Sequence, residues 1–220
     1  MAKINLHSEE LLSIPVQFKK MEKRKIKILA VSGSLRSNSS NTILLNAIEK
    51  MIPPQVEFFL YDGIGSLPHF NDADEPSVAV MEWKRYLLAS DAVLVCSPEY
   101  AFGIPGSLKN AFDWTVGSGE LVNKPLALIT AATGGEKAHG AWLQIFTALS
   151  PVIPEGCSLL ISYVRSKLNA AGEITDKATL TAVKKLLNNL ISFTQERFSQ
   201  AGRSDTGGVD EDSKVPGFDR

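Results

Sequence analysis

Short apolar runs alternate along the chain with longer segments whose apolar residues recur every three or four positions. The runs have the length of strands and are apolar almost throughout, which is typical of strands buried on both faces of a sheet. They cover residues 26–32, 56–60, 91–96, 125–130 and 158–164. This alternation predicts βαβ units, and therefore an α/β domain with one five-stranded parallel sheet and helices on both faces.

The segments between and after these runs predict five helices. Serine and asparagine at positions 39–41 are N-cap candidates for the first helix, which ends before the prolines at 53 and 54. The other helices are expected over residues 77–89, 107–116, 138–149 and 176–198. The last has the clearest helical period and carries its leucines on one face.

Five parallel strands joined by right-handed crossovers allow few arrangements, and 2-1-3-4-5 is a common order for a chain of this size. In that order the chain winds in opposite directions after the first and third strands. The loops that follow those strands then open a crevice at the carboxyl edge of the sheet, where a ligand is expected.

Composition narrows the classes of partner. The 220 residues fit one domain, expected over 25–200, with an N-terminal extension at 1–24 and a disordered tail at 201–220 that is rich in Gly, Asp and Ser. Lys and Arg number 23 against 24 Asp and Glu, without a long run of one sign. This balance argues against binding to nucleic acid or a membrane surface, so the expected partners are small molecules or copies of the chain.

The chain carries neither a membrane span nor a secretory signal in its sequence pattern. No apolar stretch approaches the roughly 20 residues that cross a bilayer, and the N-terminal charges follow the short apolar run instead of preceding it. Cys96 and Cys157 form no CxxC pair and have no histidine cluster nearby, which excludes a zinc site or thioredoxin motif built on them. We therefore expect buried thiols and a cytoplasmic protein.

The loop after the first strand has the composition of a phosphate site. Ser34, Ser39 and Thr42 offer hydroxyls, Arg36 offers a charge-assisted contact, and the helix that follows begins with unpaired N–H groups. The alternative is a capped helix preceded by a polar turn, because Ser and Asn favour both places. The loop lacks the GxxxxGK[ST] and GxGxxG patterns, so a single terminal phosphate suits it better than a nucleoside triphosphate or a dinucleotide.

Two further loops complete a recognisable set. The segment after the third strand reads PEYAFGIPGSLKNAFDW from residue 98, and the fourth strand is followed by the glycine turn TGG from residue 133. With the first loop, GSLRSNSSN from residue 33, these segments resemble the NADPH-dependent FMN reductase family over roughly residues 26 to 195. Its hallmarks are a GSLRxxSxN loop and a PEYxxxxPGxLKNAxDW segment, and the second is the more specific.

The resemblance implies a flavodoxin-like three-layer sandwich that binds FMN, and it assigns residues to the cofactor. It implies that the FMN phosphate is held by Ser34, Arg36, Ser39, Asn41 and Thr42. It implies that the isoalloxazine ring is lined by Pro98, Glu99, Tyr100, Ala101 and Phe102, and on its other edge by Thr133, Gly134 and Gly135. Many relatives carry Asn at the position of Ala101, so a polar side-chain contact there is lost.

The role of the two aromatic residues stays open. Tyr100 and Phe102 have three candidate contacts, namely the flavin ring, an incoming nicotinamide and a partner subunit, and packing within the loop is equally compatible with Phe102. The cofactor carries the redox chemistry, so no side chain is assigned as a catalytic acid or base, Glu99 included.

Two other sets of polar residues have ordinary explanations. His69, Asp72 and Asp74 lie in a turn-like segment where Asn and Asp are common, and no metal site is expected there. His139 follows the glycine turn at the start of a helix. A solvated position is expected for it, with an approach to the flavin as the alternative.

The function implied by the resemblance is an FMN-dependent NAD(P)H oxidoreductase with NADPH or NADH as co-substrate. Electrons would pass through FMN to a quinone, azo or nitro compound, metal oxyanion or free flavin by a ping-pong mechanism, in a homodimer or homotetramer. A non-catalytic flavodoxin-type carrier is the alternative, although a net charge of -1 does not supply the acidic docking face of such carriers. The third hypothesis is an interaction module that binds phosphate without flavin chemistry.

Overall fold

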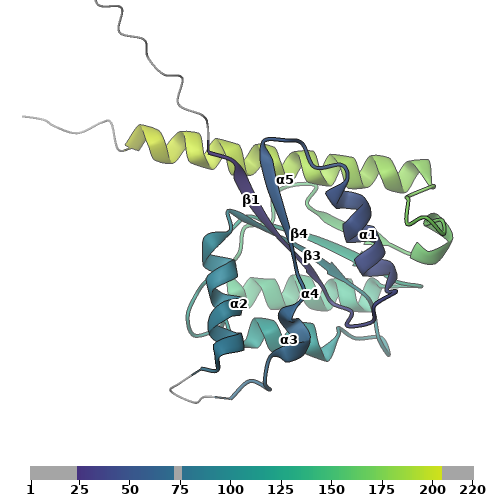
Figure 1. Cartoon of the computed structure of the whole chain (residues 1–220), viewed down its shortest axis with the longest axis horizontal. Coiled ribbons are helices and arrows are strands. Elements are labelled where there is room, and N and C mark those ends of the chain that lie inside the picture. Colours follow the sequence, from purple (N-terminus) through teal and green to yellow (C-terminus); the bar gives the residue numbers. More distant parts are fainter. Residues whose placement is uncertain (1–23, 72–75, 205–220) are drawn as a thin grey trace, which may run out of the picture.

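Five parallel strands form one sheet in the order β2-β1-β3-β4-β5, which confirms the predicted order. A computed structural model describes residues 24–71 and 76–204 (Figure 1). The strands are β1 (Ile26–Ser32), β2 (Val56–Tyr61), β3 (Ala92–Ser97), β4 (Leu126–Ala131) and β5 (Ser158–Ile161). The helices are α1 (Ser40–Glu49), α2 (Val78–Ala89), α3 (Gly106–Asp113), α4 (Glu136–Leu149) and α5 (Lys177–Ser204), with 3-10 turns η2 (Gly63–Ser66) and η3 (Val164–Lys167).

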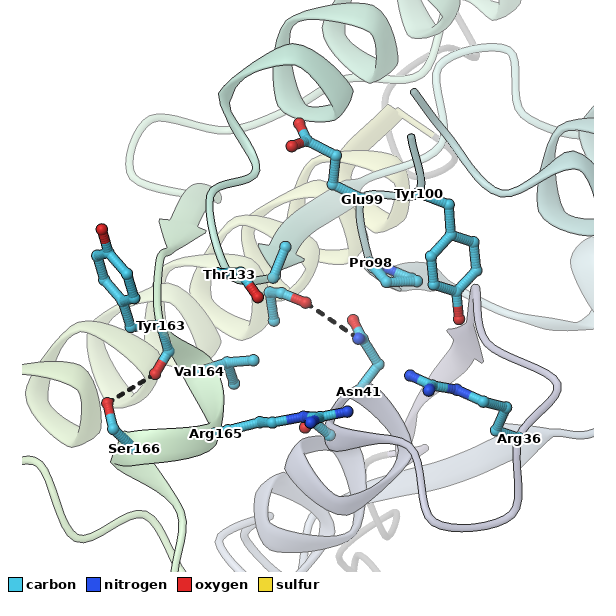
Figure 2. Close-up of a pocket in the computed structure, with 13 residues that line it drawn as sticks. Arg36, Asn41, Pro98, Glu99, Tyr100, Thr133, Tyr163, Val164, Arg165 and Ser166 are labelled. Atoms are coloured by element: carbon cyan, nitrogen blue, oxygen red, sulfur yellow. Dashed lines mark hydrogen bonds between the residues drawn. The ribbon is translucent and has the colours of Figure 1, made fainter. Parts of the chain in front are cut away.

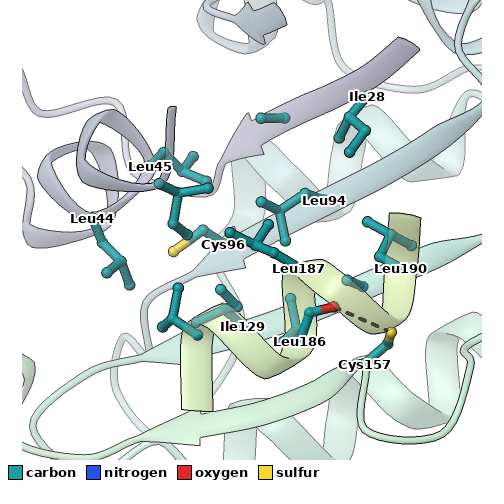
Figure 3. Close-up of a cluster of buried hydrophobic side chains, with 14 of the residues drawn as sticks. Ile28, Leu44, Leu45, Leu94, Cys96, Ile129, Cys157, Leu186, Leu187 and Leu190 are labelled. Atoms are coloured by element: carbon teal, nitrogen blue, oxygen red, sulfur yellow. Dashed lines mark hydrogen bonds between the residues drawn. The ribbon is translucent and has the colours of Figure 1, made fainter. Parts of the chain in front are cut away.

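Helices cover both faces of the sheet and give three layers. On one face α1 and α5 pack their leucines and isoleucines against alternate residues of the central strands, as seen around Leu94 and Leu187 in Figure 3. On the other face α2, α3 and α4 bring together large aromatic residues, Trp83, Phe112 and Trp142 among them. The flavodoxin-like fold expected from the sequence is therefore confirmed.

Several element boundaries differ from those predicted. The fifth strand ends at Ile161, three residues early, because Tyr163 takes a left-handed φ of 53° and leads into η3. Helix α5 continues past residue 198 to Ser204, into the segment expected to be a disordered tail. The extension over 1–23 and the rest of the tail, 205–220, lie outside the described residues.

The two thiols lie in the core between the sheet and the helices α1 and α5 (Figure 3). Burial raises the pKa of both, that of Cys157 to about 11, so each stays protonated at neutral pH. The expectation of buried cysteines is confirmed. Within residues 24–71 and 76–204, none of the helices combines the length and the apolar character that a membrane span requires.

The register of the sheet aligns the carboxyl ends of its strands. Ser32 pairs with Cys96, Ser97 with Thr130, and Ala131 with Ile161. Since parallel strands share one carboxyl edge, the loops that follow β1, β3, β4 and β5 meet there.

Candidate functional site

An open pocket of about 440 Å³ lies at this carboxyl edge (Figure 2). Its wall includes six of the thirteen residues that the sequence analysis assigned to a cofactor, namely Arg36, Asn41, Pro98, Glu99, Tyr100 and Thr133. The other seven are not part of the wall, namely Ser34, Ser39, Thr42, Ala101, Phe102, Gly134 and Gly135. The three predicted loops therefore converge as expected, but about half of the residues assigned in them do not line the pocket.

The three hydroxyls predicted to bind phosphate form bonds within the protein. Ser39 is fully buried and caps α1, its Oγ accepting the N–H of Asn41 at 3.2 Å. Thr42 Oγ1 lies 3.1 Å from Ser32 Oγ, and Ser34 Oγ lies 2.9 Å from the hydroxyl of Tyr100. The Ser39 bond is the local kind that Ser favours at a helix start, whereas the Ser34 contact joins the loop after β1 to the loop after β3. These bonds agree with the alternative of a capped helix preceded by a polar turn, and contact of the three hydroxyls with a phosphate stays a prediction.

Asn41 joins α1 to the sheet. Its Nδ2 donates to the carbonyl of Ala131 at 3.0 Å, and its Oδ1 accepts from the thiol of Cys96 at 3.1 Å. The residue is only 3% exposed. Because both ends of the amide are bonded to neighbouring strands, Asn41 fixes the N-terminus of α1 at the floor of the pocket.

Gly33 allows the first loop to approach the third strand's loop. A Cβ added there would lie 3.0 Å from both Leu108 and Pro98, and its N–H donates to the carbonyl of Cys96 at 2.8 Å. A larger residue would therefore crowd the side chains of Leu108 and Pro98.

The loop after β3 contains a tight turn at the rim of the pocket. Tyr100 and Gly103 exchange backbone hydrogen bonds of 2.9 Å, and the two residues between them both have positive φ, 48° for Ala101 and 60° for Phe102. This is the pattern of a type I′ turn, which favours Asn and Gly. The turn directs Phe102 into solvent with 82% of its surface exposed.

Replacing Ala101 by Asn is expected to stabilise the protein, by up to about 1 kcal/mol, since Asn tolerates the left-handed region better than Ala. Urea denaturation followed by circular dichroism measures the change in the free energy of unfolding. Ala101→Val should act in the opposite direction because a β-branched residue is more strained there. Equal stability of the two variants would contradict the claim that the backbone of residue 101 is strained.

Glu99 links the loop after β3 to the loop after β4. Its Oε2 accepts the N–H of Ala138 at 2.9 Å, in the first turn of α4, whose N-cap residue is Gly135 and has no side chain to offer. This bond gives Glu99 a structural task in holding two walls of the pocket together, consistent with leaving it out of the catalytic groups.

A fourth loop, which the sequence analysis did not consider, completes the pocket. The residues missed were Ser40, Ala131, Ala132, Tyr163, Val164, Arg165 and Ser166. Four of them follow β5. A fifth parallel strand must end at the same edge as the others, which is a sequence signal for this loop, but the family motifs cover only the first three loops.

His139 does not line the pocket. His139 Nδ1 is 2.8 Å from Thr130 Oγ1 and its Nε2 is 2.9 Å from Ser158 Oγ, so the ring is half-buried against β4 and β5, away from the pocket wall. Both ring nitrogens are thus within hydrogen-bond distance of side chains of the sheet. Asp72 and Asp74 lie outside the described residues. Elsewhere in the described chain, no group of three or more His, Cys, Asp or Glu is placed to hold a metal.

Burial lowers the pKa of His139 below its usual value of 6.5. The folded state therefore binds this proton less readily than the unfolded state. Its contribution to stability is complete above about pH 6.5 and is lost as the pH falls through the folded pKa. We expect the free energy of unfolding to decrease less on acidification in His139→Gln than in the parent, as measured by urea titrations at neutral and mildly acidic pH. Identical slopes would contradict this.

Comparison with known proteins identifies the class. The family model for NADPH-dependent FMN reductases matches residues 26–165. The chain is 31% identical over 176 residues to an NAD(P)H-dependent FMN reductase of Pseudomonas aeruginosa, covering 75% of this chain and 93% of that protein. It is 32% identical over 184 residues to an NADPH:quinone oxidoreductase of Arabidopsis thaliana, covering 77% and 92%.

A solved structure of a flavoenzyme also resembles this chain. FerB, a flavoenzyme NAD(P)H:(acceptor) oxidoreductase from Paracoccus denitrificans, superposes with a TM-score of 0.69 at 29% identity, covering 78% of this chain and 98% of that one. The fold, the converging loops and the family match agree with one another. The chain belongs to the NADPH-dependent FMN reductase family and is an FMN-dependent oxidoreductase of the NAD(P)H-using flavin and quinone reductase class.

Proposed function

We propose that FMN lies in the pocket at the carboxyl edge, and that the chain uses it to pass electrons from NAD(P)H to a quinone or a similar small acceptor by a ping-pong mechanism. The observation that carries this proposal is the pocket itself, formed where the loops after β1, β3 and β4 meet at the N-terminus of α1. Crevices at this edge of open α/β sheets are the usual ligand sites.

The residues present suit FMN in charge and in shape. At the phosphate end, the N-terminus of α1 favours an anion, and Arg36 has no ion pair with any described residue. At the ring end, Pro98 and Tyr100 form a wall close to Thr133 (Figure 2). A volume of about 440 Å³ falls within the range typical of cofactor pockets.

When bound, FMN supplies the redox chemistry by taking hydride from the nicotinamide and returning electrons to the acceptor. The protein's part is to bind and to orient. Glu99 fixes the loop after β3 to the first turn of α4, and Asn41 fixes the helix that would hold the phosphate. The mouth stays open between these walls, so nicotinamide and acceptor would occupy it in turn.

Steady-state rates tell this mechanism from a sequential one. With NADPH and a benzoquinone both varied, double-reciprocal plots should give parallel lines. Intersecting lines would contradict the ping-pong mechanism while leaving the reductase activity in place. Replacing the quinone by an azo dye, a nitro compound, chromate or free FMN would rank the acceptors, and comparison with NADH would give the nicotinamide preference.

The non-catalytic carrier remains the alternative function, and nothing in the described residues favours it. A protein that binds FMN but oxidises neither NADPH nor NADH with any acceptor would support it.

We also propose that a second copy of the chain packs beside the pocket in a homodimer or homotetramer. Phe102, two positions after the pocket residue Tyr100, has 82% of its surface exposed, and Phe70, on the α2 and α3 side of the sheet, is 50% exposed. Aromatic residues are enriched at protein interfaces, and this enrichment supports the proposal. Analytical ultracentrifugation should give a dimer or larger, and a monomer at micromolar concentration would contradict it.

Arg36→Ala is expected to weaken FMN binding by about 10- to 100-fold, which corresponds to about 1.5 to 3 kcal/mol for a charged hydrogen bond. Quenching of FMN fluorescence on titration with the protein measures the dissociation constant. The melting temperature without FMN should not change, because the Arg36 side chain contacts the described residues only at a distance, 6.0 Å from the Tyr100 ring. Equal affinity in variant and parent would remove Arg36 from the site.

A further inference from the structure

We propose that Arg165 is a second phosphate-binding arginine, which faces Arg36 across the pocket and makes the site select phosphorylated flavin over riboflavin. This inference rests on the proposed binding of FMN in the pocket. It adds a residue from the loop after β5, outside the three loops to which the sequence motifs assign the cofactor.

Arg36 and Arg165 approach the pocket from opposite sides. Both line it, and Figure 2 shows their guanidinium ends turned from opposite sides toward Asn41 and the start of α1. Arg36 comes from the loop before α1, whereas Arg165 comes from η3. A phosphate placed at the N-terminus of α1 would therefore lie between two arginines.

Neither guanidinium is neutralised within the described part of the chain. The ion pairs found there involve Arg24, Arg85 and Lys109 as the basic partners. The one carboxylate on the pocket wall is Glu99, and one of its oxygens is already bonded to the first turn of α4. The phosphate end of the pocket thus holds an excess of positive charge that an anion would offset.

Arg165 is carried by a segment with a fixed conformation. The N–H of Tyr163 donates to the carbonyl of Thr133 and that of Val164 to the carbonyl of Ala132, both at 3.1 Å. Val164 is 4% exposed and belongs to the core, and Ser166 bonds back to Tyr163. The left-handed φ of 53° at Tyr163 turns the chain so that η3 borders the pocket. Because the backbone of this segment is fixed, the Arg165 side chain reaches a limited set of positions.

Charge explains the expected selectivity. A phosphate monoester carries about 1.5 to 2 negative charges at neutral pH, which one arginine offsets only in part. Riboflavin shares the ring and the ribityl chain but has no charge at this end. Two arginines therefore strengthen binding of FMN without a matching effect on riboflavin.

The test compares FMN and riboflavin binding in the full-length parent and in Arg165→Ala by fluorescence quenching. We expect FMN affinity to fall by about 10-fold or more, and riboflavin affinity to change by less than about twofold. Added salt should weaken FMN binding less in the variant than in the parent, since a charge contact is already missing.

Lys167→Ala is the matched control. Lys167 lies in the same 3-10 turn, two residues along, and its loss changes the net charge equally, but it does not line the pocket. It should leave the FMN dissociation constant close to that of the parent. Circular dichroism and the melting temperature check that both variants fold.

Each of the following results would overturn the inference. Equal FMN affinity in Arg165→Ala and the parent would remove the residue from the phosphate site. An equal loss of riboflavin affinity in Arg165→Ala would mean that the substitution disturbs the pocket in general. An equal loss of FMN affinity in Lys167→Ala would mean that net charge alone causes the effect. Unchanged FMN binding with a raised KM for NADPH but not for NADH would assign Arg165 to the nicotinamide's phosphate. A parent protein that binds no FMN would instead reject the proposed function.

Discussion

Trp142→Ala is expected to lower the free energy of unfolding by about 3 to 5 kcal/mol, the usual cost of removing a large aromatic side chain from a core. Trp142 is fully buried in α4. Its ring lies 5.5 Å from that of Phe112 and 5.4 Å from that of Phe146, centroid to centroid, and its Nε1 donates to Ser97 Oγ at 2.7 Å. Urea denaturation followed by circular dichroism measures the loss.

Trp142→Phe separates packing from hydrogen bonding. It keeps a ring in the cluster but removes the donor to Ser97, the last residue of β3 and the neighbour of Pro98. We expect a smaller loss, about 1 to 2 kcal/mol, together with weaker FMN binding if this bond positions the pocket loop. A loss of stability below about 1 kcal/mol in Trp142→Ala would contradict the view that this aromatic cluster is the centre of the core on the α2, α3 and α4 face of the sheet.

Gly135→Ala is expected to destabilise the protein by about 2 to 4 kcal/mol, from a strained backbone and a crowded side chain together. Gly135 has a φ of 116°, which residues with a Cβ rarely adopt. An added Cβ would lie 2.7 Å from Leu160 Cδ1 and 3.3 Å from Thr130 Cγ2. Because Gly135 is the N-cap of α4, the strain would also disturb the bond between Glu99 and Ala138.

Gly140→Ala is the control for this prediction. Gly140 lies within α4, is exposed and has nothing within 4 Å of an added Cβ. Alanine there should stabilise the protein by about 0.5 to 1 kcal/mol because of its higher helix propensity. If the two substitutions shifted the urea midpoint in the same direction, the claim that the Gly135 conformation requires glycine would be wrong.

The fold was predictable because its signals are local and repeated. Strands buried on both faces require continuous apolar runs, and the crossover rules reduce the possible orders to a few. The end of β5 was missed because Ser162 and Tyr163 extend a β-like sequence, whereas the left-handed turn at Tyr163 depends on bonds to the loop after β4. Tertiary contacts of this kind leave no local pattern.

The site was predictable only in part, for a similar reason. Motifs located three loops but did not indicate which hydroxyls are free, and Ser34, Ser39 and Thr42 are all bonded within the protein. Arg165 lies outside any motif that the sequence analysis used, and only the shared edge of the parallel strands brings it to the pocket.

Anaerobic addition of NADPH, and separately of NADH, to the FMN-loaded protein tests the central claim most directly. The visible absorbance of the bound flavin should bleach with at least one nicotinamide and return when a benzoquinone is added. The Arg36→Ala protein should retain less flavin under the same conditions. A protein that holds FMN through repeated washing, yet shows no bleaching with either nicotinamide, would contradict the account.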